Sequence, residues 1–186
     1  VGVGDVLIGA AALAADYNGA AKASHVKDKL IEMTHLNETL FSCGIACSAQ
    51  GYKTASGTYL IDLLLANVCK QNVTRFPYEI CRLAEVIAGG MMVTMASEKD
   101  FKNPEIGRVL EKYLKGTANV SCEDRARIMR LVENLTLGTA AVGYRTESMH
   151  GAGSPQAQRI MIARQGNLEQ KKNLAKNIAG IKEEKK

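Results

Sequence analysis

The sequence predicts an all-α fold, an antiparallel bundle of several long helices. Over most of the chain apolar residues recur at steps of three and four, the spacing of one helix face. No stretch shows the alternation of a strand, and no internal repeat is present. A chain of 186 residues can bury one sizeable core. We therefore predict a single domain over residues 1–186 that closes in a Lys-rich helix and tail at 167–186.

The first two predicted helices differ in character. Residues 4–23 are rich in alanine, and small side chains let a helix lie close against its neighbours. A long amphipathic helix follows from about Ser24, a favourable N-cap residue, to Gln50. Gly51 is expected to end it.

A third long helix is predicted from about Thr58 to the pair Gly89-Gly90, which ends it. Pro77 lies inside this segment, and a proline removes a backbone donor and clashes with the preceding turn. We therefore predict a kink near residues 75–76 within one continuous helix.

A connector follows the third helix. The helical periodicity is lost over residues 91–100. Asn103 and Pro104 then supply a cap and a first-turn proline, which predict a short helix that Gly116 ends.

The last helices are marked by capping residues. Ser121 and Asp124 have the spacing of a capping box, and a helix is predicted from there toward Tyr144. Two more helices are predicted, one from Ser154-Pro155 to Gly166 and one over 167–179 before Gly180.

The composition, 46% hydrophobic and 23% charged, is ordinary for a soluble globular protein. The net charge of +5 is mild and aromatic residues are only 5% of the chain, so a nucleic-acid partner is not expected. The apolar run at 6–15 is shorter than the roughly 20 residues that cross a bilayer, so no membrane partner is expected. Five cysteines, an odd number, without a signal peptide indicate a reducing compartment, and we expect the cytoplasm.

One predicted helix face carries His35, Thr39, Cys43 and Cys47 at successive four-residue steps. Histidine and cysteine are zinc ligands, so this face allows a metal site. Any helix brings residues four apart together, however, and cysteine is often a small buried hydrophobe. Packing is the preferred interpretation, and no residue is assigned to a metal.

The segment 143–159 carries the most chemistry, with the sequence GYRTESMHGAGSPQAQR. Glu147 is expected near a helix end, with His150 three residues later and a bendable loop through Gly153. The helix that opens at Ser154 presents free backbone N–H groups to an anion or a polarised oxygen. A buried carboxylate here would act as an acid–base group, because burial raises its pKa toward neutrality. A capped loop with a solvated glutamate is the alternative.

These residues resemble the C-terminal domain of the 4-hydroxybutyryl-CoA dehydratase / vinylacetyl-CoA delta-isomerase family, in the wider 4-hydroxyphenylacetate hydroxylase and acyl-CoA dehydrogenase-like group. The resemblance covers almost the whole chain and is most specific over 22–47, with SHVKDKLIEMTHLNETL, over 67–90 and over 143–164. Residues 98–121 depart most. The resemblance implies the helical bundle of the acyl-CoA dehydrogenase C-terminal domain. We expect the chain, which opens on Val1, to be the C-terminal part of a longer enzyme.

The resemblance also implies an enzyme that uses FAD and a 4Fe-4S cluster to dehydrate 4-hydroxybutyryl-CoA to crotonyl-CoA and to isomerise vinylacetyl-CoA. A thioester acidifies only the C2 proton, and in this family loss of the C3 proton is assigned to one-electron exchange with the flavin, with cluster iron as Lewis acid. Glu147 matches a glutamate that transfers protons beside the flavin. Gly89 and Gly90 match a pair that touches the flavin of a neighbouring subunit, and Ser154 and Gln156 are further candidates for FAD contact.

The cluster ligands of the family, three Cys and one His, match nothing in this chain and are expected before Val1. The expected partners are an acyl-CoA substrate, the N-terminal portion of the same enzyme and further copies in a homotetramer. The chain alone is expected to be inactive. Two alternatives stay open: the C-terminal domain of a flavin-dependent aromatic hydroxylase of the 4-hydroxyphenylacetate 3-monooxygenase type, and a non-catalytic helical oligomerisation domain.

Overall fold

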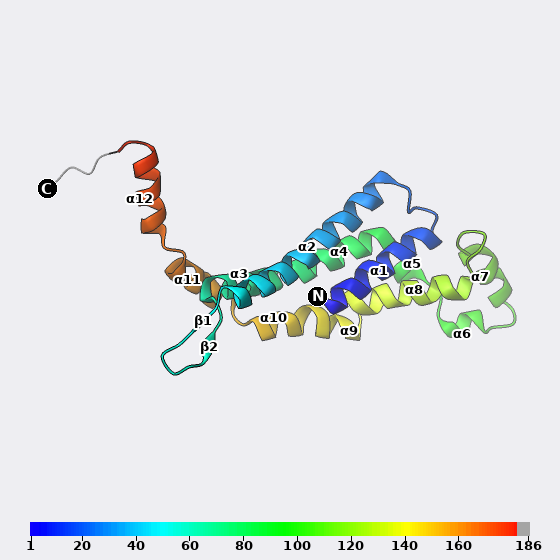
Figure 1. The fold of residues 1–186 in the computed structure, drawn as a ribbon. Helices are drawn as coiled ribbons and strands as arrows, with labels where there is room; N and C mark the ends of the chain where they lie inside the picture. The colour runs from blue at the N-terminus through cyan, green and yellow to red at the C-terminus, as the bar shows by residue number, and fades with distance from the viewer. Residues whose placement is uncertain (182–186) are drawn as a thin grey trace.

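The structure is a computed structural model that describes residues 1–181. It is an elongated helical bundle in which α11 and α12 lie at one end and α6 and α7 at the other (Figure 1). The predicted all-α bundle is confirmed. The elements are α1 (Gly2–Tyr17), α2 (Ser24–Ala49), β1 (Tyr52–Lys53), β2 (Tyr59–Leu60), α3 (Leu63–Val73), α4 (Phe76–Ala88), α5 (Met91–Thr94), α6 (Glu98–Phe101), α7 (Gly107–Leu114), α8 (Cys122–Thr136), α9 (Thr139–Ala141), the π-helix η1 (Val142–Thr146), α10 (Glu147–Ala152), α11 (Pro155–Gln165) and α12 (Leu168–Ile178).

The core lies where α1 packs against α2, α4 and α8. The alanines of α1 leave room for the backbones of these helices to come close, as the sequence predicted. Large apolar side chains from all four helices are fully buried around them: Leu7, Met33, Ile80, Met129 and Val132. Burial of each such side chain contributes about 1.5–3 kcal/mol to folding.

The ends of α1 and α2 differ from the predicted ones. α1 ends at Tyr17 rather than near residue 23, because Gly19 adopts a positive φ of 73° that no helix continues through. Ser24 is the first residue of α2 and not its N-cap. Ala23 holds the cap position in an extended conformation and makes no side-chain hydrogen bond.

The predicted third helix is two helices, α3 and α4, so the prediction of one kinked helix was wrong. α3 begins only at Leu63, because the Asp62 carboxylate accepts a hydrogen bond from the backbone N–H of Leu65 at 2.7 Å and caps it. The chain breaks at residues 74–75, next to the kink predicted near residues 75–76. Pro77 then lies in the first turn of α4, where its missing N–H has no partner to lose.

A short antiparallel hairpin, β1 and β2, fills the segment that was expected to hold no strand. Tyr52 pairs with Leu60 and Lys53 with Tyr59. The Tyr59 ring lies against Gly51, where a Cβ would be 2.5 Å from it, and its hydroxyl donates to the Ser48 carbonyl oxygen at 2.7 Å. Strands of two residues are too short to give an alternating pattern.

The connector contains three short helices. Ser97 and Asp100 form a reciprocal capping box at the start of α6. The Asn103 side chain accepts hydrogen bonds from the N–H groups of Glu105 and Ile106, as a cap would, but α7 begins only at Gly107. The predicted short helix is therefore present, three residues later than its cap suggested.

The segment from Ser121 toward Tyr144 was predicted as one helix, but it holds three elements, α8, α9 and η1. The Ser121 hydroxyl accepts from the backbone N–H of Asp124 at 3.0 Å and caps α8, as predicted. α8 ends at Thr136, and α9, η1 and α10 follow it up to Ala152. A Cβ on Gly138 would lie 2.6 Å from the Asn134 side chain, which shows how tightly the chain turns there.

The two last helices begin and end where the sequence placed them. Pro155 opens α11 and Gly166 ends it, and Asn167 caps α12 through its side chain, which accepts from Gln170 N–H. α12 stands away from the bundle and buries none of its described residues (Figure 1). The end of the predicted Lys-rich tail, 182–186, lies outside the described residues.

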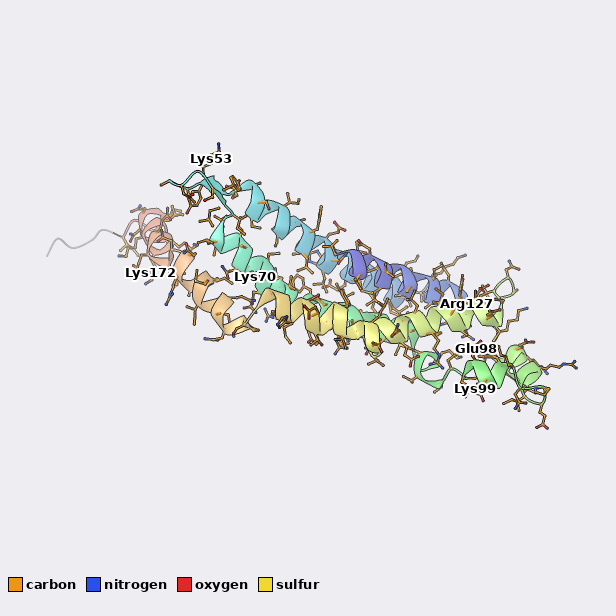
Figure 2. The ribbon with its side chains drawn as sticks, turned by 90° about the horizontal axis from the view of Figure 1, so that it is seen from below. Lys53, Lys70, Glu98, Lys99, Arg127 and Lys172 are labelled. Atoms are coloured by element: carbon orange, nitrogen blue, oxygen red, sulfur yellow. The ribbon has the colours of Figure 1, made fainter. Side chains whose placement is uncertain are left out.

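Charged side chains project from the whole length of the rod. Figure 2 shows Lys53, Lys70 and Lys172 toward one end and Glu98 and Arg127 toward the other. Among residues 1–181 no helix combines the length and the apolar character needed to cross a membrane.

Candidate functional site

Glu147 is the first residue of α10 and projects from the surface of this chain. Its side chain is 69% exposed, and one carboxylate oxygen lies 3.5 Å from Nδ1 of His150, one turn later on the same helix. The sequence placed Glu147 near a helix end, as observed, but the bendable loop expected between it and Gly153 was wrong. The helix continues to Ala152, so only residues 153–154 remain as a loop.

The π-helix η1 leads directly into Glu147. π-helices are rare, and those that do occur are frequently found at functional sites. Within η1, Tyr144 turns inward and is only 5% exposed. The Arg145 guanidinium donates to the Thr136 carbonyl oxygen at 2.5 Å and lies 4.8 Å from the centre of the Tyr78 ring. These contacts fix the start of α10 on α8 and α4.

The far end of α10 is held by Gln158, which the sequence interpretation missed. Gln158 is 3% exposed, and its Nε2 donates to the carbonyl oxygens of Ala152 at 2.7 Å and Gly153 at 3.1 Å. These two carbonyls end the helix that carries Glu147, where Gly153 takes a positive φ of 86°. A glutamine one turn after Ser154 was the only sequence signal for this role.

Ser154 and Gln156 lie at the exposed start of α11. Ser154 holds the N-cap position, but its side chain makes no capping hydrogen bond. The first backbone N–H groups of α11 and the Ser154 hydroxyl are therefore open to a ligand, as expected of this helix N-terminus.

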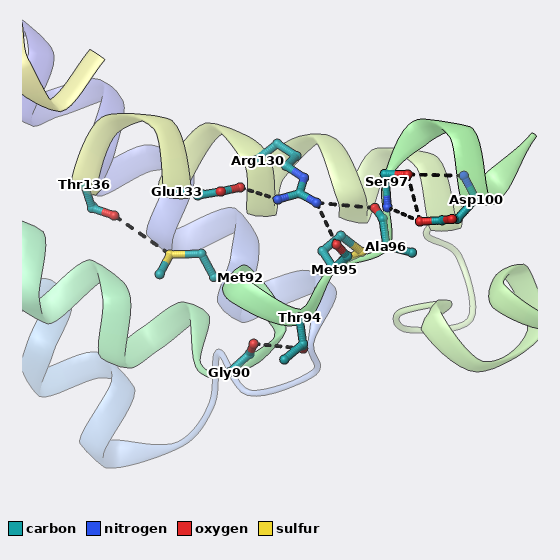
Figure 3. Close-up of polar contacts among 10 residues, drawn as sticks. All are labelled: Gly90, Met92, Thr94, Met95, Ala96, Ser97, Asp100, Arg130, Glu133 and Thr136. Carbon is teal, nitrogen blue, oxygen red and sulfur yellow. Dashed lines mark hydrogen bonds and ion pairs between the residues drawn. The ribbon is translucent and has the colours of Figure 1, made fainter. Parts of the chain in front are cut away.

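Gly89 and Gly90 form an exposed turn between α4 and α5. A Cβ added to either glycine would meet no atom within 4 Å, so the space above them is open. Gly89 takes a positive φ of 67° and ends α4, as predicted. The Thr94 hydroxyl donates to the Gly90 carbonyl oxygen at 2.9 Å (Figure 3).

The segment after the glycine pair is tethered to α8. Arg130 donates to the Met95 carbonyl oxygen at 2.6 Å and pairs with Glu133 (Figure 3). The Thr136 hydroxyl lies 3.9 Å from the Met92 sulfur, while its carbonyl oxygen accepts from Arg145. Thr136, which is fully buried, therefore touches both the segment of the glycine pair and the segment of Glu147.

The predicted residues do not form one cluster within this chain. In residues 1–181, no hydrogen bond or ion pair joins Glu147 to the glycine pair, Ser154 or Gln156. Two hollows of about 970 and 560 Å³ are lined by none of them. The larger lies between α6, α7 and α8, and the smaller lies between α3 and α11.

The cysteines of α2 and α3 pack at the contact between these helices. The Cys47 thiol donates to the Gly44 carbonyl oxygen at 3.2 Å, and Asn72 lies 4.0 Å from the Cys43 sulfur. Burial, and then the neighbouring Cys43 and Cys47, raise the pKa of the Cys69 thiol. The part of the chain that the structure describes contains no group of three His, Cys, Asp or Glu side chains placed to hold a metal ion.

Comparison with known proteins confirms the resemblance to the dehydratase family. The 4-hydroxybutyryl-CoA dehydratase/vinylacetyl-CoA-Δ-isomerase of Clostridium aminobutyricum is 71% identical over 190 residues, 98% of this chain and 39% of that protein. The oxygen-tolerant archaeal 4-hydroxybutyryl-CoA dehydratase of N. maritimus has a similar structure, with a TM-score of 0.91 and 67% identity over 97% of this chain and 36% of that one.

Aromatic hydroxylases are more distant relatives. The oxygenase component of 4-hydroxyphenylacetate 3-monooxygenase from Thermus thermophilus is 29% identical over 72% of this chain and 27% of that protein. The structure of such an oxygenase component in complex with FAD and 4-hydroxyphenylacetate gives a TM-score of 0.83 at 25% identity, over 94% of this chain and 36% of that one. The chain thus spans less than half the length of these relatives.

The sequence also matches the family described as 4-hydroxyphenylacetate 3-hydroxylase C terminal over residues 1–180. Since the match takes in almost the whole chain, from α1 through α12, the chain belongs to the 4-hydroxyphenylacetate 3-hydroxylase C-terminal family.

Proposed function

We propose that this chain is the C-terminal helical bundle of an enzyme that dehydrates 4-hydroxybutyryl-CoA to crotonyl-CoA and isomerises vinylacetyl-CoA. The observation that carries the proposal is the 71% identity to the C. aminobutyricum enzyme over 98% of the chain. The T. thermophilus hydroxylase component shares only 29% over a shorter stretch.

Glu147 is the proposed proton-transfer group. Its carboxylate lies next to His150 at the start of a helix that is held at both ends, so its position is fixed although its side chain is exposed. Acid–base work at neutral pH requires partial burial. In the proposal, the N-terminal portion of the enzyme and neighbouring subunits supply that burial.

Gly89 and Gly90 are the proposed contact for FAD. The bare glycine surface fits a flat ring, because no side chain of residues 1–181 fills the space above it. Ser154, Gln156 and the N-terminus of α11 are further candidates, since backbone N–H groups bind phosphate and other anionic oxygens. FAD, when bound, supplies the electron exchange that the C3–H bond requires.

A 4Fe-4S cluster does not fit the described residues. Clusters of this kind need four ligands, mostly cysteine thiolates, and residues 1–181 hold no group of three candidate ligands. We therefore propose that the ligands of the cluster lie outside this chain. No residue of this chain is given a role in the reaction that depends on the cluster.

Exposed apolar side chains support burial of this chain in a larger assembly. Ile31, Phe41 and Ile45 lie along one side of α2, and Val6 and Leu13 lie on α1, all exposed. Exposed apolar side chains that recur on one side of a helix are typical of a surface that packs against another chain or domain. It fits a homotetramer in which the bundle also contacts the N-terminal portion of the enzyme, in the reducing environment of the cytoplasm.

A flavin-dependent aromatic hydroxylase is the second candidate, favoured by the shared family and the TM-score of 0.83. Chemical analysis of the purified full-length enzyme separates the two. We expect flavin absorbance, iron and acid-labile sulfide, and conversion of 4-hydroxybutyryl-CoA to crotonyl-CoA. Flavin without iron or sulfide, together with oxygen-dependent hydroxylation of 4-hydroxyphenylacetate by added reduced flavin, would reject the dehydratase proposal.

A further inference from the structure

Two buried polar side chains, Asn37 and Tyr144, lie beneath the start of α1, next to the exposed carboxylate of Asp5. The Tyr144 cluster consists of Asp5 on α1, Asn37 on α2 and Tyr144 on η1. Asn37 is 1% exposed, and its Nδ2 donates to an Asp5 carboxylate oxygen at 2.7 Å. Three segments that are far apart in the sequence therefore meet here.

Two buried oxygens of the Tyr144 cluster have no hydrogen-bond partner among the described residues. They are Oδ1 of Asn37 and the hydroxyl of Tyr144. A Cβ on Gly4 would lie 2.2 Å from the Asn37 oxygen and 3.2 Å from the Tyr144 oxygen, so both lie beside the same point of α1. A slight movement of either side chain, or one bridging water, would join the hydroxyl donor to the amide acceptor.

The Tyr144 hydroxyl is not needed for packing. A phenylalanine would fill the same volume, and a buried polar group costs free energy unless it is hydrogen-bonded. Burial, and then the nearby Cys81 and Asp5, raise the pKa of this hydroxyl well above its ordinary value, so it remains a neutral donor. A buried hydroxyl of this kind contributes more to the orientation of the segment that carries it than to the stability of the fold.

Tyr144 is three residues before Glu147, on the π-turn that opens into α10. α10 buries only Ala152 of its own residues, so its direction is set by what holds its two ends. Gln158 holds the far end, and Tyr144 with Arg145 holds the near end. Catalytic groups must be held close to their productive geometry, and a misplacement of about 1 Å can cost a hundredfold in rate.

We propose that Tyr144 is a positioning residue for Glu147: its buried hydroxyl, paired with the nearby Asn37 amide oxygen directly or through one water, sets the orientation of the π-turn from which Glu147 projects. The inference rests on the proposed catalytic role of Glu147. It implies that turnover depends on Tyr144, a core residue that does not contact the substrate.

The test is Tyr144→Phe in the full-length holoenzyme. We expect kcat to fall on the order of ten- to a hundredfold, while KM, FAD content and the thermal unfolding temperature stay close to wild type. Tyr113→Phe is the matched control, because Tyr113 is 71% exposed on α7, and it should have wild-type kcat. An unchanged kcat in Tyr144→Phe overturns the proposal.

A double-mutant cycle separates positioning from a general structural role. If Tyr144 acts through Glu147, Tyr144→Phe causes no further loss of kcat in a Glu147→Gln enzyme. An equal loss in both backgrounds would show that Tyr144 acts independently of Glu147. Near-normal activity of Glu147→Gln alone would instead reject the proposed role of Glu147, which is a different outcome.

Gly4→Ala tests the Tyr144 cluster with a substitution on α1. Its Cβ displaces the Asn37 amide without removing a hydrogen-bonding group, so we expect the same fall in kcat at unchanged KM, again absent in the Glu147→Gln background. Wild-type kcat in a folded Gly4→Ala enzyme contradicts the proposal. Failure of both Gly4→Ala and Tyr144→Phe to fold assigns the cluster to stability and also overturns positioning.

Discussion

Arg145 donates a hydrogen bond to the carbonyl oxygen of Thr136 across the short segment, containing α9, that separates α8 from the π-helix. The carbonyl belongs to the last turn of α8, where main-chain acceptors lack partners within the helix. The guanidinium also lies over the Tyr78 ring of α4 at 4.8 Å. One side chain therefore joins three elements immediately before Glu147.

Arg145→Lys should destabilise the 186-residue chain by about 1–2 kcal/mol. An ammonium keeps the charge but loses the planar stack on Tyr78 and the fork geometry that reaches Thr136. Urea unfolding followed by circular dichroism measures the change. Arg127→Lys is the matched control: Arg127 forms an exposed ion pair with Glu123, and we expect a change below about 0.5 kcal/mol. Equal effects of the two variants would contradict the anchoring role.

Glu147→Gln should lower turnover of the full-length enzyme by roughly 10²- to 10⁴-fold, the usual contribution of a general acid–base group. The amide keeps the size of the side chain but cannot take up a proton at neutral pH. FAD content should stay unchanged, as absorbance of the purified variant will show. Glu169→Gln, on the exposed α12, serves as the control. Near-normal turnover would remove Glu147 from the reaction.

Gln158→Ala should cost about 1–3 kcal/mol of stability, because it leaves the carbonyl oxygens of Ala152 and Gly153 without their donor. Freed of this clamp, the turn after α10 should become accessible to protease. Limited proteolysis and urea unfolding measure the two effects. Gln165→Ala, at the exposed end of α11, is expected to change neither. An unaltered cleavage pattern in Gln158→Ala would show that the turn is held by other contacts.

The buried thiol of Cys81 should lower the free energy of unfolding at alkaline pH. Burial first, and then Glu85, raise the pKa of its thiol from 9.0 to about 12, while Arg145 partly opposes them. Between these values the unfolded chain releases a proton that the folded chain retains. The contribution of Cys81 is therefore complete below pH 9 and declines as the pH rises toward 12, by up to about 1.4 kcal/mol per pH unit.

Urea unfolding at pH 8 to 10.5 measures this decline. Cys81→Ala should be less stable at pH 8, because it leaves a small cavity, but its stability should fall less steeply with pH than that of the wild type. Cys43→Ala, at a half-buried thiol on α2, is the control and should keep the wild-type slope. Parallel slopes for Cys81→Ala and wild type would exclude Cys81 as the titrating group.

Local signals explain what the sequence predicted correctly. Ser121, Asn167 and Gly166 each begin or end a helix through hydrogen bonds and conformations within a few residues, so the sequence places those ends well. The position of Glu147 on a helix depends on contacts of Arg145 with α8 and α4. The role of Gln158 likewise depends on how α11 folds back. No local sequence pattern predicts the position of Glu147 or the role of Gln158.

Gly90→Ala distinguishes a ligand surface from a plain helix stop. Gly89 has a positive φ, so a side chain there would strain the backbone whatever the ligand. Gly90 has an ordinary φ of −60° and open space at its Cβ position, so alanine should leave folding unchanged.

If the flavin lies on this turn, the added methyl group should raise the Kd for FAD of the full-length apoenzyme on the order of tenfold, equivalent to about 1.4 kcal/mol. Gly44→Ala in α2, also with no atom within 4 Å of the new Cβ, should leave FAD binding unchanged. Wild-type FAD affinity in Gly90→Ala would mean that the pair only ends α4, and the flavin contact would have to be sought at Ser154 and Gln156.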